Sequence, residues 1–199
     1  MLPVADPPKN RTLVLHALRR VAEFEFERIS DLRAQIHAQR QQKWKSFLKT
    51  ARDWEGDPEL AEVAANTRAE LDSILELAEQ MLGVATYRVV ELTTVKILGW
   101  RWGPETVRRK ELYKVDHLHA VLQTEMQADL SSVQDFSVAD ELRCLNNAIK
   151  HNGYVNAQLA AFPGWQLGEP IGDCGPTLER LSGPVGNYLS TLAQLIVPM

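Results

Sequence analysis

The sequence predicts an all-α protein, a bundle of about four to five helices with an irregular loop before the last one. Three observations indicate this class. Apolar residues recur at short helical intervals along most of the chain, strand-like alternation is scarce, and glycine and proline gather at a few breaks. With 199 residues, 45% of them hydrophobic, the chain can form one domain with a substantial core. We expect a proline-containing tail at residues 1–10 and a single helical domain over residues 11–199.

The first expected helix begins at Arg11 and carries its apolar residues at intervals of two to five. Its pattern becomes polar and basic through Gln35–Lys49. A break follows at residues 53–58, because Gly56 and Pro58 are stop signals. The segment Asp57-Pro58-Glu59 then suits an N-cap, a proline at the first helical position and an acidic first turn.

The second expected helix runs from this start to about Trp100. That length exceeds what most globular helices reach, so Gly83 or the β-branched run Val89–Val95 is expected to kink or divide it. Gly103-Pro104 marks the next break and restart.

Three further helical segments are expected in the second half of the chain. They cover about Val107 to Leu130, Val138 to His151 and Val185 to Ile196. Asn152-Gly153 suits a left-handed stop after the middle one. The glycines and prolines between Phe162 and Pro176 predict the irregular loop.

The bulk properties narrow the function classes. A formal net charge of −4 disfavours an overall basic surface for nucleic acid or membrane. No run approaches the roughly 20 apolar residues that span a bilayer, and the N-terminus does not resemble a signal peptide. Cys144 and Cys174 lack metal-ligand spacing, and no glycine-rich nucleotide motif is present. We therefore expect a cytoplasmic protein without metal or cofactor.

A row of polar residues stands out in the segment that ends at His151. Arg143, Asn147 and His151 follow one another at four-residue spacing, so they share one face of a helix. Lys150 lies beside them. The opposite, core-facing stripe consists of Leu142, Leu145 and Ile149.

These residue types suit chemistry on a phosphodiester. Arginine and lysine stabilise anionic oxygens, Asn147 can orient a ligand, and a histidine such as His151 can accept and donate protons. A plainer reading is favoured on chemistry alone. Lysine and histidine often only complement the C-terminal end of a helix, and Arg143 can pair with Asp140, Glu141 or a more distant acid.

The run Glu141-Leu142-Arg143-x-x-x-Asn147-Ala148-Ile149-Lys150-His151-x-Gly153 resembles the signature helix of HEPN-type proteins. These are small helical-bundle domains of prokaryotic toxin and defence systems, many of them metal-independent endoribonucleases. Their usual motif is an arginine, a polar residue and, a few residues later, a histidine. Asn147 and His151 match the last two, whereas Asn146 stands where the arginine is expected. The close resemblance covers about 15 residues.

The resemblance implies a HEPN-like bundle that acts on RNA as a homodimer, with a site formed where two such helices meet. It implies catalytic roles for Arg143, Asn147 and His151, and substrate contacts for Glu141, Asn146 and Lys150. An antitoxin or a defence-system protein is an implied partner. The displaced arginine favours an alternative, a catalytically inactive HEPN-like module for ligand binding or protein–protein interaction. A purely structural helical domain is a third possibility.

Other polar clusters have ordinary explanations. A basic stretch around Trp44 and Phe47 suits RNA contact, although charge runs usually mean a solvated helix face. Arg101, Arg108, Arg109 and Lys110 form a smaller basic cluster of the same kind. His117 and His119 point to different faces of a helix, so we expect surface histidines rather than metal ligands.

Overall fold

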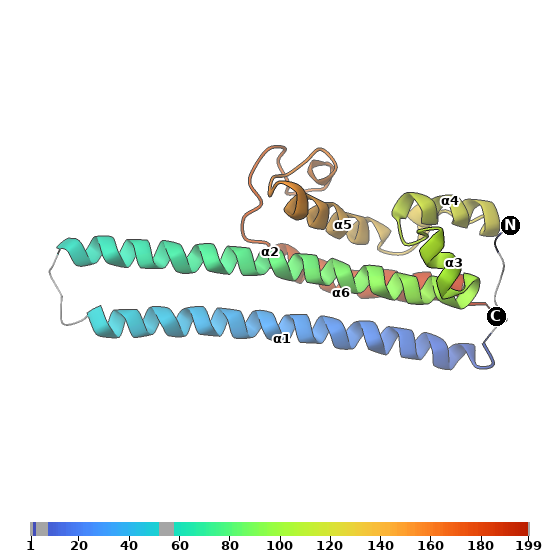
Figure 1. Ribbon diagram of the computed structural model, residues 1–199, viewed down its shortest axis with the longest axis horizontal. Helices are drawn as coiled ribbons and strands as arrows, with labels where there is room; N and C mark the ends of the chain where they lie inside the picture. The colour runs from blue at the N-terminus through green and yellow to red at the C-terminus, as the bar shows by residue number, and fades with distance from the viewer. Residues whose placement is uncertain (1, 3–7, 52–57, 199) are drawn as a thin grey trace.

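The computed structural model describes residues 2, 8–51 and 58–198. Within these residues the protein consists of helices and loops, with no β-strand, and the predicted all-α class is confirmed (Figure 1). The α-helices are α1 (Arg11–Ala51), α2 (Pro58–Trp102), α3 (Pro104–Arg109), α4 (Val115–Met126), α5 (Phe136–His151) and α6 (Gly175–Ile196). Short 3₁₀ helices lie at Leu130–Ser132 and Leu159–Ala161.

The long helices α1 and α2 form an antiparallel hairpin to which the remaining helices attach (Figure 1). Helix α6 packs against both of them on one side of the hairpin, and α5 packs on α2 and α6. The far ends of α1 and α2 project beyond the other helices. We call residues 38–51 of α1 and 58–75 of α2 the distal hairpin. No helix among the described residues has the length and apolarity needed to cross a membrane.

The hydrophobic core lies at the opposite end of the molecule, between the second half of α2 and helices α5 and α6. Ile97, Leu98, Leu142 and Leu145 are fully buried there, as are Leu181, Val185, Leu192 and Ile196 of α6. Helix α1 contributes only Leu18 and Ala22 as fully buried residues. Burial of apolar surface therefore holds α2, α5 and α6 together, whereas α1 depends more on polar contacts.

Helix α2 is continuous through Gly83, so the expected division does not occur. Gly83 lies where α5 and α6 pack against α2. A Cβ atom at this position would lie 3.6 Å from the Ile149 side chain of α5 and 3.7 Å from the Leu178 side chain of α6. These are ordinary van der Waals distances, so side chains of α5 and α6 both contact α2 at this glycine.

The prediction of a single helix over Val107–Leu130 is wrong, because the chain turns between α3 and α4. Glu111 adopts a left-handed conformation with φ of 49°, and the Leu112 N–H donates to the Val107 carbonyl at 3.0 Å. This turn buries Leu112, which is 2% exposed. No glycine in the sequence indicates this turn. Burial of Leu112 offsets the unfavourable backbone conformation of Glu111.

Helix α6 begins at Gly175, ten residues before the predicted start at Val185. Pro184 lies inside the helix and removes one backbone donor, which is why the sequence pattern suggested a break. Leu178, Leu181 and Val185 are buried on one face and hold the helix together across the proline. By contrast, the predicted stop of α5 is confirmed, since Gly153 has φ of 70° and its N–H donates to the Ala148 carbonyl. The predicted break and N-cap at Asp57 fall in residues 52–57, outside the described residues.

A buried carboxylate joins α1, α2 and α6. Glu79 of α2 is fully buried, and its Oε1 accepts from the Arg33 Nε of α1 at 2.8 Å and lies 2.6 Å from the His37 Nε2. Arg33 also donates from Nη1 to Glu179 of α6 at 2.5 Å. The guanidinium passes so close to Gly175 that a Cβ there would meet it. A single arginine thus connects three helices.

Replacing Arg33 by methionine should destabilise the fold by about 3 kcal/mol, because it leaves the Glu79 carboxylate buried without its cation. The measurement is urea unfolding followed by circular dichroism, in which the midpoint falls at unchanged slope. Arg28→Met is the matched control, since Arg28 pairs with Glu25 on the exposed side of the same helix. Equal midpoints for the two variants would contradict the role of Arg33.

Candidate functional site at the end of α5

Helix α5 carries all six residues that the sequence singled out. It forms because Ala139, Leu142, Leu145 and Ala148 recur at helical spacing and bury one face against α2 and α6. The structure divides the six residues into two groups. Glu141, Arg143 and Asn146 are engaged inside the protein, whereas Asn147, Lys150 and His151 extend toward the helix end.

Glu141 is 3% exposed and faces α6. Arg180 forms a bidentate pair with it, donating to Oε1 at 2.6 Å and to Oε2 at 2.9 Å. The Trp165 indole Nε1 also donates to Oε1 at 2.8 Å. Both carboxylate oxygens are therefore used to join α5 to α6 and to the loop before it. This geometry gives Glu141 a structural role.

Arg143 is half-buried against α2. Its Nε donates to Asp140 at 2.7 Å, which is one of the intrachain pairs foreseen from the sequence. Burial opposes its charge, but the hydrogen bond to Asp140 prevails and the pKa of Arg143 is raised. Together with Tyr87 and Glu91, Arg143 lines a cavity of about 20 Å³, which is too small for a nucleotide.

Asn146 occupies the position at which the HEPN family places its arginine, and it is 2% exposed. Its amide nitrogen donates to the Asn147 Oδ1 at 3.3 Å, and its own Oδ1 has no hydrogen-bond partner among the described residues. Asn147 is half-buried. The asparagine pair therefore forms the boundary between the buried and the exposed parts of α5.

Lys150 and His151 are exposed in the last turn of α5. Among the described residues neither side chain forms a hydrogen bond or an ion pair. Eight residues separate Arg143 from His151, which corresponds to about 12 Å along the helix axis. The two side chains of one chain are thus too far apart to act on the same phosphate. One copy offers a lysine and a histidine, with Asn147 one turn away.

Two arginines of the basic stretch of α1 are paired with acidic neighbours. Arg40 pairs with Asp72 of α2, and Arg33 with the two glutamates described above. Trp44 stacks on Phe47 with ring centroids 5.4 Å apart, and the Arg68 guanidinium covers it at 5.8 Å. The indole ring is therefore already covered, and the exposed charges that remain are Lys43, Lys45 and Lys49.

The histidines of α4 lie in separate local contacts. His117 lies 3.1 Å from the Lys110 carbonyl oxygen, and His119 lies 3.6 Å from Asp129. Both belong to separate local contacts, as predicted for surface histidines. In the part of the chain that the structure describes, no three His, Cys, Asp or Glu side chains come together in a geometry that holds a metal ion.

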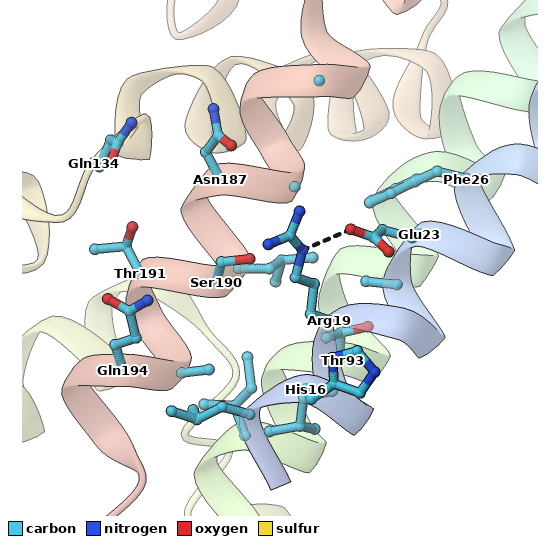
Figure 2. Close-up of a pocket in the computed structure, with 18 of the residues that line it drawn as sticks. His16, Arg19, Glu23, Phe26, Thr93, Gln134, Asn187, Ser190, Thr191 and Gln194 are labelled. Carbon is cyan, nitrogen blue, oxygen red and sulfur yellow. Dashed lines mark hydrogen bonds and ion pairs between the residues drawn. The ribbon is translucent and has the colours of Figure 1, made fainter. Parts of the chain in front are cut away.

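Sequence reasoning missed a groove between α1 and α6 (Figure 2). It has a volume of about 790 Å³, and an Arg19–Glu23 ion pair of 2.6 Å lies along its α1 wall. The α6 wall carries small residues, among them Ser182, Gly186 and Ser190. Their four-residue spacing was the available signal, but the last helix was predicted to begin only at Val185.

Comparison with protein-family models, with curated proteins and with solved structures finds no match to this chain. The HEPN resemblance therefore rests on the residues of α5 alone.

Replacing Glu141 by glutamine should destabilise the protein by about 3 kcal/mol, because Arg180 loses its charged partner and Trp165 loses its ionised acceptor. His151→Ala is the matched control on the same helix and should leave the unfolding midpoint unchanged, since His151 is exposed and unpartnered. Thermal or urea unfolding of both variants measures the difference. Unchanged stability in Glu141→Gln would contradict the structural role of this carboxylate.

Tyr87, beside Arg143, should make stability fall at alkaline pH. Burial, and next the nearby Glu91, raises the pKa of Tyr87 to about 12, whereas a tyrosine in the unfolded chain ionises near 10. Between these values the unfolded chain loses a proton that the folded protein keeps, so the free energy of unfolding decreases as pH rises. Urea unfolding from pH 9 to 11.5 measures the slope. Tyr87→Phe should make it shallower, and an unchanged slope would refute the assignment.

Proposed function

We propose that this chain is a HEPN-like protein of a prokaryotic toxin or defence system that cleaves RNA in the cytoplasm without a metal ion. Its site is composed of the α5 ends of two copies. One observation carries the proposal: Lys150 and His151 stand exposed and unpartnered side by side, in the part of α5 that resembles the HEPN signature. Both cysteines are free and buried, which is consistent with a reducing compartment.

The chemistry needs only the RNA itself. The neutral imidazole of one His151 removes the proton of a ribose 2′-hydroxyl, whose oxygen then attacks the adjacent phosphorus. The bond from phosphorus to the 5′-oxygen breaks, and the protonated His151 of the other copy gives its proton to that leaving oxygen. Lys150 stabilises the charge on the phosphate oxygens, and Asn147 orients the sugar or base. The products carry a 2′,3′-cyclic phosphate and a 5′-hydroxyl.

Two copies are required because one chain has a single exposed histidine at this helix end. Arg143 lies about 12 Å along the axis from His151 and is held by Asp140. It can contribute only to a phosphate that a second copy presents at the α2 side. Homodimerisation thus supplies both the second proton-transfer group and the second lysine.

A specific observation favours a second candidate, a catalytically inactive HEPN-like module that binds a ligand or a partner protein such as an antitoxin. Glu141 and Arg143 are occupied by Arg180 and Asp140, and Asn146 is buried without a cation in its place. Half of the residues that the resemblance assigns to the site are therefore engaged in holding α5. In this case Lys150 and His151 form a contact surface.

Purified protein should cleave a short end-labelled RNA in excess EDTA, and His151→Ala should reduce the rate at least a hundredfold, because proton transfer by a positioned histidine contributes roughly that much. His117→Ala, an exposed histidine on α4, is the control and should retain full activity. Chromatography of the products identifies the cyclic phosphate end. Equal cleavage by wild type and His151→Ala would contradict the ribonuclease proposal. Binding of RNA without cleavage would favour the inactive module.

A further inference from the structure

Helix α2 has an apolar stripe that none of the described residues covers. Ile74, Leu77, Met81 and Leu92 are 61%, 58%, 50% and 44% exposed. Their spacing of three, four and eleven residues places them on one side of the helix. That side is opposite Gly83, which packs against the Leu178 side chain of α6. The stripe therefore lies on the face of the hairpin that points away from α6.

Helix α1 carries a matching stripe. Leu13, Val21, Phe24 and Leu32 are between 40% and 62% exposed and follow at intervals of eight, three and eight residues. They lie on the side of α1 opposite the groove wall, which faces α6. Because α6 packs on one side of the hairpin, both stripes belong to its other side (Figure 1). We call this side the open face.

The ion pairs between the two helices bring the stripes together. Arg33 meets Glu79 and Arg40 meets Asp72, which fixes the antiparallel register. In this register Leu32 comes beside residues 77–81, and Val21 beside Leu92. The eight side chains lie along the open face, with the exposed Arg28 and Arg88 between them. Together the eight side chains expose on the order of 800 Å², which is the contribution of one partner to a standard interface.

The charges of the distal hairpin indicate what covers the open face. Residues 38–51 of α1 contain four basic residues and no acidic one: Arg40, Lys43, Lys45 and Lys49. Residues 58–75 of α2 contain four acidic residues and one basic one: Glu59, Glu62, Glu70 and Asp72, with Arg68. A uniformly acidic or basic partner would be repelled by half of this surface. A second copy related by a two-fold axis places each basic α1 segment on an acidic α2 segment, so the surface is complementary to itself.

We propose that the open face of the α1–α2 hairpin binds a second copy of this chain, hairpin on hairpin, to form a four-helix interface. This contact is separate from the meeting of α5 ends in the proposed ribonuclease and does not rest on it. Tyr87, four residues after Gly83, lines a cavity with Arg143 of α5 and lies on the side of α2 away from the stripe. Because α5 packs on α2, a two-fold axis that sets α1 on α2 places the two α5 helices at opposite edges of the interface.

Sedimentation equilibrium tests the apolar contact. The wild-type protein should be a dimer at 10 µM, and Leu77→Lys/Met81→Lys should weaken dimerisation at least a hundredfold. Leu167→Lys is the matched control, because Leu167 is 70% exposed in the loop before α6 and lies off the open face. Circular dichroism verifies that each variant is folded. A monomeric wild type, or a double variant that dimerises like wild type, would overturn the proposal.

Charge exchange tests the two-fold arrangement. Lys43→Glu/Lys49→Glu makes α1 acidic, and Glu62→Lys/Glu70→Lys makes α2 basic. Each variant alone should dimerise poorly, since like charges meet at both contacts. An equal mixture should restore a dimer, because both contacts of the mixed pair are then complementary. No recovery in the mixture would overturn the two-fold pairing. A dimer with inactive α5 ends would instead refute the ribonuclease and leave this interface standing.

Discussion

The position of α5 depends on the buried carboxylate of Glu141. Its two oxygens bind Arg180 of α6 and the Trp165 indole, so one side chain fixes the helix against its neighbour and against the preceding loop. A buried carboxylate is costly unless each oxygen is satisfied, and here each is. The consequence for function is direct. Glu141, the first residue of the HEPN-like run, holds α5 in place, and only the last turn of α5 remains available to bind a ligand.

Glu79 is a second buried carboxylate, partnered through Oε1 alone, and its link to α6 is at Glu179, the residue next to Arg180. It is buried in α2 and bound by Arg33, which also reaches α6. Buried ion pairs add little net stability compared with apolar residues, but removal of one partner is severe. A hairpin shifted by one turn would leave Glu79 or Arg33 buried alone. The apolar repeats of these helices would by themselves permit several registers. The two carboxylates therefore act mainly by excluding the alternative registers.

Helix boundaries were predictable where the backbone chemistry is local. Gly103-Pro104 separates α2 from α3, and Gly153 ends α5, because glycine and proline impose these conformations wherever they occur. The turn at Glu111 and the continuation of α6 through Pro184 were not predictable, since burial of Leu112 and Leu181 overrides the local preference.

The same distinction applies to the candidate site. Helical spacing correctly placed Arg143, Asn147 and His151 along one row, and the pairing of Arg143 with Asp140 three residues away was among the alternatives. The burial of Glu141 was not accessible from the sequence. Its partners lie 24 and 39 residues further along the chain, and only the packing of α6 and the loop brings them to it.

The projecting distal hairpin has a consequence for how this architecture can vary. Its two helices contact each other but lie beyond α5 and α6, so no contact with those helices fixes their length. Matched insertions of seven residues in both helices, two turns each, would preserve the facing side chains and extend the arm by about 10 Å. The length by which the distal hairpin projects can therefore change by insertion without any change to the core.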